Sequence, residues 1–176
     1  MSNLDNLGNV LIRSDLNVPI KDGEITDNFR IYKSVEIIEN IIDKSRTITF
    51  TSHMGRPDGK DFNLSLKPIA ECMTNILGKE VLFIEEVLGE RVEEQIEKSD
   101  YKIFLLENLR FEKGEIENDK NFSRQITKPF NSYIFDAFGA AHREHASVVS
   151  FCENLESFQC PLLYLKLLDM KSGGHY

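Results

Sequence analysis

Short apolar runs alternate with segments of helical periodicity along most of the chain, and this alternation restricts the fold more than any other feature of the sequence. Each run is short enough for one buried strand, and the runs cover residues 9–14, 46–51, 81–84, 102–106 and 131–135. Helix-length crossovers join parallel strands and cover both faces of a sheet. We therefore expect an α/β fold, a three-layer α/β/α Rossmann-like domain with a mostly parallel sheet.

Capping and turn residues give the expected limits of the helices. Candidate N-caps at 26–28 precede apolar positions that recur at helical spacing from Ile31 to Ile42, which predicts one helix. Ser65 is the candidate N-cap of a second helix, and Gly78 ends it. Further helices are expected at 89–98 and near 119–127, and a tight hairpin turn is expected at Asp22-Gly23.

The net charge of -8 argues against nucleic acid or an anionic membrane as a partner. No apolar run approaches the roughly 20 residues that cross a bilayer, and the N-terminus lacks the pattern of a signal peptide. We therefore expect a cytoplasmic protein. Its odd number of cysteines, without Cys-x-x-Cys spacing, suggests neither a disulfide framework nor a zinc site; the cysteines are Cys72, Cys152 and Cys160.

Polar and charged side chains stand where four of the expected strands end. They are Asp15 and Asn17 after the first run, His53 and Arg56 after the second, Arg110 after the fourth and Arg143 after the fifth, joined by Arg30 from the start of the first helix. Parallel strands bring all their carboxyl ends to one edge of a sheet. We therefore expect these side chains to face one crevice, where arginine forks suit a compact anion bearing phosphate or carboxylate.

Each of these residues also has a simpler explanation. A single loop arginine is more often a solvated charge or a surface ion pair. Asp15 could cap a turn or orient an arginine, or accept a hydrogen bond from a substrate hydroxyl. His142 and His145 have no evident third metal ligand. It is the joint position at strand ends that favours an anion site.

The sequence does not match the known motifs of two kinds of phosphoryl-transfer protein. Asp15-Leu-Asn17 resembles the nucleophile motif of haloacid-dehalogenase-like phosphatases, but Asn17 cannot transfer the proton that the second carboxylate of that motif carries. The P-loop pattern and G-x-G-x-x-G are both absent from the sequence.

Five motifs, in order along the chain, resemble the N-terminal domain of phosphoglycerate kinases. They are Val10-Leu-Ile-Arg-Ser-Asp-Leu-Asn-Val-Pro19, Ile25-Thr-Asp-Asn-Phe-Arg30, Ser52-His-Met-Gly-Arg-Pro57, Leu106-Glu-Asn-Leu-Arg-Phe111 and Phe135-Asp-Ala-Phe-Gly-Ala-Ala-His-Arg143. The resemblance covers about residues 8 to 163 and fades after them. It implies a domain at 1–163 that binds the acceptor substrate, followed by a tail at 164–176.

The resemblance also implies a reaction: reversible transfer of the γ-phosphoryl group of MgATP to the carboxylate of 3-phosphoglycerate, in glycolysis. It assigns the binding of 3-phosphoglycerate to the residues identified above at the strand ends and the first helix, which are Asp15, Asn17, Arg30, His53, Arg56, Arg110 and Arg143. Arg30 is the implied catalytic residue, since it would stabilise charge on the transferred phosphoryl group.

The nucleotide and metal motifs of the family's C-terminal domain have no counterpart in this sequence. We therefore expect MgATP or MgADP to be bound by that other domain and not by this chain, which would be inactive alone and could be complemented by a nucleotide-binding domain in trans. The expected oligomeric state is a monomer. The alternative hypothesis is a stand-alone, non-catalytic module that binds a phosphorylated acid or another small anion.

Overall fold

The computed structural model describes residues 6–21 and 23–155. A five-stranded sheet with the strand order β5-β6-β4-β1-β7 forms its centre. Every pairing in it is parallel, as predicted; the strands are β1 (Gly8–Ser14), β4 (Ser45–Thr51), β5 (Val81–Ile84), β6 (Ile103–Leu106) and β7 (Ser132–Asp136). The expected hairpin is also present as β2 (Ile20–Lys21) and β3 (Glu24–Ile25), where Gly23 has φ +83° and Asp22 lies outside the described residues.

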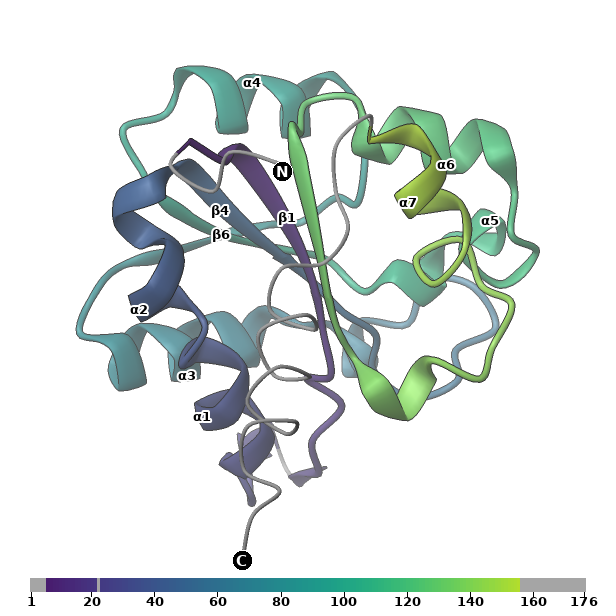
Figure 1. Ribbon diagram of the computed structural model, residues 1–176. Helices are drawn as coiled ribbons and strands as arrows, with labels where there is room; N and C mark the ends of the chain where they lie inside the picture. The colour runs from purple at the N-terminus through teal and green to yellow at the C-terminus, as the bar shows by residue number, and fades with distance from the viewer. Residues whose placement is uncertain (1–5, 22, 156–176) are drawn as a thin grey trace, which may run out of the picture.

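Helices cover both faces of the sheet (Figure 1). One face carries α1 (Phe29–Val35), α2 (Ile38–Ile41) and α3 (Lys67–Leu77), and the other carries α4 (Glu90–Lys98), α5 (Lys113–Ile116), α6 (Lys120–Thr127) and α7 (Ser150–Asn154). Along β1, Val10 and Ile12 join the hydrophobic core under α3, whereas Leu11 joins the core on the opposite face. This alternation produces the three layers predicted from the sequence.

The path of the chain through the sheet determines where a crevice forms. From β1 the chain moves to β4 and then β5 with its helices on one face, and it returns through β6 to β7 with its helices on the other. Right-handed crossovers require this change of face when the direction reverses. The segments leaving the neighbouring strands β1 and β7, and β4 and β6, therefore diverge at the carboxyl edge, which is where ligands bind in such sheets.

The helix predicted from Ile31 to Ile42 is interrupted. α1 ends at Val35, α2 starts at Ile38, and a 3-10 turn, η1 (Ile42–Lys44), leads into β4. Ile37 is buried and Ile42 is only partly buried, whereas a straight helix with Ile38 and Ile42 on its inner face would turn Ile37 away from the core. The break lets Ile37 reach the core, and burial outweighs the regular helical pattern.

The start of α3 also differs from the prediction. Leu66, not Ser65, is the residue before the helix, and the Glu107 carboxylate at the end of β6 accepts a hydrogen bond from the Leu66 N–H at 2.9 Å. The Ser65 hydroxyl donates to the same carboxylate at 2.7 Å and accepts from the Lys67 N–H at 3.2 Å. A distant acidic residue therefore caps this helix, which a local pattern cannot reveal.

Gly8 and Gly78 provide a matched test of packing at the sheet, because both have a left-handed backbone, with φ +62° and +60°. A Cβ at Gly78 would meet nothing within 4 Å, whereas one at Gly8 would collide with the Asn131 side chain. We expect Gly78→Ala to lower the free energy of unfolding by about 1 kcal/mol through backbone strain alone. Gly8→Ala should lower it by a further 1–3 kcal/mol or so. Urea unfolding of both variants checks this, and equal losses would contradict it.

Candidate anion-binding site

Three of the predicted arginines line one pocket at the carboxyl edge of the sheet. Arg56 follows β4, Arg110 lies in the 3-10 turn η3 (Leu109–Phe111) after β6, and Arg143 follows β7. The pocket has a volume of about 280 Å³, and its other lining residues are Pro57, Ile116 and His145. In the described part of the chain, none of the three arginines is ion-paired with an acidic side chain. Their charges are therefore available to an anion in the pocket.

The predicted residue His53 lies behind these arginines as a neutral imidazole. Burial, together with the nearby positive charges of Arg13, Arg110 and Arg143, lowers the pKa of His53 to about 3. Nη2 of Arg13 is 2.7 Å from Nδ1 of the ring. Because a guanidinium can only donate, Nδ1 accepts and the ring proton is on Nε2. His53 can therefore donate one hydrogen bond without adding a charge.

Asp15, Asn17 and Arg30 form a second cluster beside the pocket. Nη1 of Arg30 is 3.0 Å from Oδ2 of Asp15 and also donates to the main-chain oxygen of Asn17 at 3.3 Å. The Arg30 side chain is 54% exposed, so this ion pair lies in water and is weak enough for a ligand carboxylate to compete with it. Unlike the pocket arginines, Arg30 thus has an acidic partner in the absence of ligand.

Gly55 joins the two clusters. Its N–H donates to Oδ1 of Asn17 at 3.1 Å, and its carbonyl accepts a hydrogen bond from Nη1 of Arg110. Gly55 has φ +61°, and a Cβ there would lie 3.0 Å from the Leu64 side chain. Glycine is therefore required for both its backbone conformation and its close packing.

Residues that the sequence analysis left without a role hold these loops in position. Asn108 is fully buried, and its amide forms hydrogen bonds to Met54 N, Met54 O, Leu64 O and Arg110 N. These bonds use the full capacity of one amide side chain. Asn108 therefore ties the loop after β4 to the turn that carries Arg110. Its position in the motif Leu106-Glu-Asn-Leu-Arg-Phe111 was noted, but only Arg110 received a role.

Arg13 was also missed, although the sequence held a signal for it. It is 2% exposed, lies inside the apolar run of β1 and contacts His53 at its far end. A charged side chain inside an otherwise apolar strand is almost never fully buried unless it is paired. Its presence in that run therefore indicated an internal polar network.

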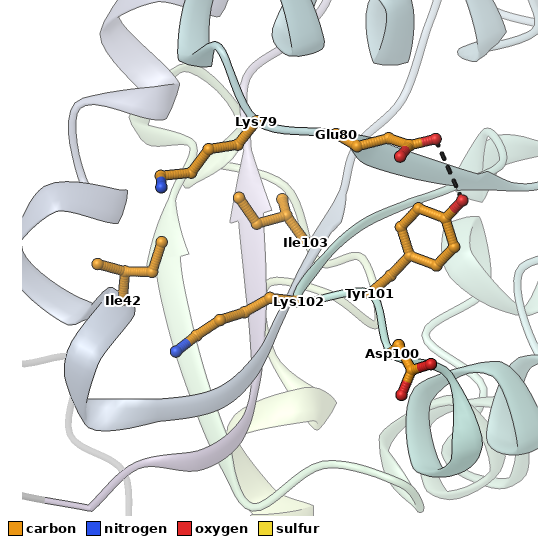
Figure 2. Close-up of a pocket in the computed structure, with 7 residues that line it drawn as sticks. All are labelled: Ile42, Lys79, Glu80, Asp100, Tyr101, Lys102 and Ile103. Atoms are coloured by element: carbon orange, nitrogen blue, oxygen red, sulfur yellow. Dashed lines mark hydrogen bonds between the residues drawn. The ribbon is translucent and has the colours of Figure 1, made fainter.

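A pocket larger than the one lined by the arginines lies at the opposite edge of the sheet. It has a volume of about 610 Å³ and lies at the amino ends of β5 and β6, lined by Ile42, Lys79, Glu80, Asp100, Tyr101, Lys102 and Ile103 (Figure 2). Figure 2 shows Lys79 and Lys102 extending towards Ile42, while the Tyr101 hydroxyl bonds to Glu80 at 3.1 Å on the other side. It includes no predicted site residue, so pocket size alone does not identify the site.

Within residues 6–21 and 23–155, no group of three or more His, Cys, Asp or Glu side chains could hold a metal ion. Cys72 is a free thiol, and Cys160 lies outside the described residues. No helix in the same part of the chain is both long and apolar enough to span a membrane.

A parallel α/β sheet whose strand ends gather several arginines near a neutral histidine defines a class, the Rossmann-like domain with a cationic carboxyl edge. Comparison with known proteins places the chain more narrowly. A family model described as phosphoglycerate kinase matches residues 3–170, and the chain belongs to this family.

Individual relatives agree with the family match. The chain is 45% identical over 150 residues to a phosphoglycerate kinase of Wolbachia sp. subsp. Drosophila simulans (strain wRi), covering 85% of this chain and 38% of that protein. It is 41% identical over 149 residues to the enzyme of Borreliella burgdorferi (strain ZS7), covering 84% of this chain and 38% of the relative. The chain thus spans well under half the length of the curated relatives it matches.

Solved structures of phosphoglycerate kinases also match this chain over part of their length. The phosphoglycerate kinase of Coxiella burnetii superposes with a TM-score of 0.75 at 32% identity, covering 94% of this chain and 41% of that one. The enzyme of Pyrococcus horikoshii OT3 superposes with a TM-score of 0.80 at 25% identity, covering 94% and 42%. The α/β fold with its parallel sheet is therefore the fold of part of these enzymes.

The lowered pKa of His53 predicts how stability depends on pH. The folded protein keeps the ring neutral down to about pH 3, whereas the unfolded chain binds a proton near pH 6.5. The stabilising contribution is therefore complete above pH 6.5 and is lost as the pH falls from 6.5 towards 3. His53→Gln should reduce the slope of the unfolding free energy in this range by up to about 1.4 kcal/mol per pH unit. Urea unfolding at several pH values measures it, and identical slopes would contradict the neutral histidine.

Proposed function

We propose that this chain binds 3-phosphoglycerate at the carboxyl edge of its sheet, as the acceptor-substrate part of a phosphoglycerate kinase. The observation that carries the proposal is the pocket shared by Arg56, Arg110 and Arg143, next to the cluster of Asp15 and Asn17. A dianionic phosphate and a carboxylate in one small molecule match two neighbouring polar clusters of this kind.

The two clusters suggest a division of roles. Arg56, Arg110 and Arg143 line a space suited to the phosphate of 3-phosphoglycerate. His53 does not line this pocket but lies near Arg110 and Arg143, and its Nε2–H would add an uncharged donor to the bound phosphate. Asp15 and Asn17 would orient the hydroxyl and carboxylate end: the Asp15 carboxylate can accept a hydrogen bond from the hydroxyl, and the Asn17 amide nitrogen can donate to the carboxylate.

Arg30 is proposed as the residue that acts in transfer. Its side chain is half exposed at the rim and is held by Asp15 and the Asn17 carbonyl, so it borders the acceptor carboxylate without lining the phosphate pocket. A guanidinium at that point can stabilise charge on a phosphoryl group arriving from solvent or from a second domain.

The proposed reaction is the reversible transfer of the γ-phosphoryl group of MgATP to the 3-phosphoglycerate carboxylate. MgATP or MgADP would be held by the nucleotide-binding part of the full-length family, which could act in trans, because phosphoryl transfer depends on positioning and on exclusion of water. A monomeric state and a cytoplasmic location remain predictions from the sequence.

A stand-alone anion-binding module is the second candidate, since the polar groups described for binding all come from this one chain. Calorimetry with 3-phosphoglycerate, glycerol 3-phosphate and inorganic phosphate separates the two. The proposed site requires 3-phosphoglycerate to bind more tightly than either ligand that lacks the carboxylate. Equal affinity for all three would favour a general anion module.

Single substitutions test the division of roles. We expect Arg56→Ala and Arg143→Ala to weaken 3-phosphoglycerate binding roughly 10- to 100-fold, as for loss of charge-assisted hydrogen bonds. Arg30→Ala should weaken it less, because Arg30 acts chiefly in transfer. Arg91→Ala is the matched control, since Arg91 is exposed and pairs with Glu86 away from the site. Equal losses for Arg30 and Arg56 would contradict the role of Arg30.

A coupled ATP-dependent assay tests the reaction. The chain alone should show no turnover with 3-phosphoglycerate and MgATP, and a separately expressed nucleotide-binding domain of a phosphoglycerate kinase should restore measurable turnover. Restored turnover should be lost with Arg30→Ala in this chain. Substantial turnover by the chain alone would overturn the assignment of nucleotide binding to another domain.

A further inference from the structure

A buried carboxylate lies behind the cationic pocket and has no role so far. Glu115, in α5, is 1% exposed, and both of its oxygens are engaged by one residue of the segment after β7. Oε2 accepts from the Ser147 N–H at 3.0 Å, and Oε1 accepts from the Ser147 hydroxyl at 2.6 Å. Two charge-assisted hydrogen bonds thus fasten this segment to α5.

The Ser147 hydroxyl continues inwards from Glu115. It accepts a hydrogen bond from Nε of Arg13 at 3.1 Å while donating its only proton to Glu115. At its other end, Arg13 donates from Nη2 to Nδ1 of His53 at 2.7 Å. Arg13 therefore donates at both ends, to Nδ1 of His53 on one side and to Ser147 on the other, and Ser147 in turn donates to Glu115. Reversing the His53 tautomer would bring an N–H against the Arg13 donor.

Charge explains why the carboxylate is needed there. Burial lowers the pKa of Arg13, and Glu115 is the strongest influence that opposes this. The other charged or titratable groups acting on the His53 ring are Arg110, Arg143 and His145, and the last of these is 3.8 Å from the Glu115 carboxylate. A buried guanidinium without a compensating charge would be expelled or would distort its surroundings.

We propose that Glu115 and Ser147 are positioning residues for the anion site: they hold Arg13 against Nδ1 of His53, so that His53 keeps its proton on Nε2 and offers it to the anion. This inference extends the proposed binding of 3-phosphoglycerate and depends on it for the ligand. Neither residue lines the pocket of Arg56, Arg110 and Arg143. Both act through Arg13.

A purely structural role is the competing explanation, because the same segment has other attachments. The Ala146 N–H donates to the Glu115 carbonyl at 2.9 Å, and the Tyr133 hydroxyl donates to the Ser147 carbonyl. Loss of stability alone would therefore not separate the two roles. The state of the His53 ring does, because it responds to Arg13 and not to the strength of the fold.

The test uses the full chain labelled with ¹⁵N-histidine, without ligand, at neutral pH. In the unsubstituted protein, the nitrogen shifts of His53 should show Nδ1 unprotonated and Nε2 protonated, as a single tautomer. Ser147→Ala removes one hydroxyl and keeps the N–H donated to Glu115, so it should fold. It should give His53 a mixture of tautomers, and Glu115→Gln should do the same.

The second measurement is the affinity of each variant for 3-phosphoglycerate, obtained by calorimetry. Both variants should bind more weakly in proportion to the loss of the Nε2–H tautomer, about twofold for an equal mixture and about tenfold where that tautomer falls to a tenth of the population. Glu153→Gln is the matched control, since Glu153 is an exposed acid paired with Lys120. It should keep the tautomer and the affinity of the unsubstituted protein.

An unchanged single tautomer in both folded variants would overturn the proposal. Failure of the unsubstituted protein to bind 3-phosphoglycerate would instead overturn the proposed function. The two failures are distinguishable, because the tautomer is measured without ligand.

Discussion

The mutual repulsion of positive side chains at one edge of the sheet is the constraint on which the rest of the structure depends. The pKa of Arg110 is lowered by burial and by the nearby charges of Arg143 and Arg13. A buried guanidinium among other positive charges is stable only if neighbouring groups accept its hydrogen bonds or balance its charge. Backbone carbonyls of Ser14 and Gly55 accept from Arg13 and Arg110, and Glu115 supplies one buried negative charge. Keeping His53 neutral adds a donor without further repulsion.

Hydrogen bonds also hold the backbone segments of the site in place before any ligand binds. Asn108 and Gly55 connect the segments that leave β4, β6 and β1, and Glu107 joins the end of β6 to the start of α3. An anion entering the pocket therefore meets backbone segments and an Arg110 guanidinium that are already held in place, and less free energy is lost in ordering them. The ion pair of Arg30 and Asp15 is held more loosely, because it is largely exposed to solvent.

Much of the architecture and of the candidate site was predictable from local sequence. Short apolar runs separated by helical periodicity indicated the sheet, its parallel strands and its covered faces, because strand length and apolar spacing are local properties. Residues that follow a strand must lie at its carboxyl end, so the gathering of Arg56, Arg110 and Arg143 in one pocket followed from topology. Their proposed contacts with a substrate remain predictions.

Local patterns of residues were therefore enough to specify the strands and the side chains that follow them at one edge. The tertiary structure alone decided the strand order, the break between α1 and α2, the capping of α3 by Glu107, and the buried connection from Glu115 through Ser147 and Arg13 to His53. The bond from Arg13 to Ser147 spans 134 positions and that from Ser147 to Glu115 spans 32. Partners so far apart are chosen by burial and unpaired polar groups in the folded core, which no local pattern records.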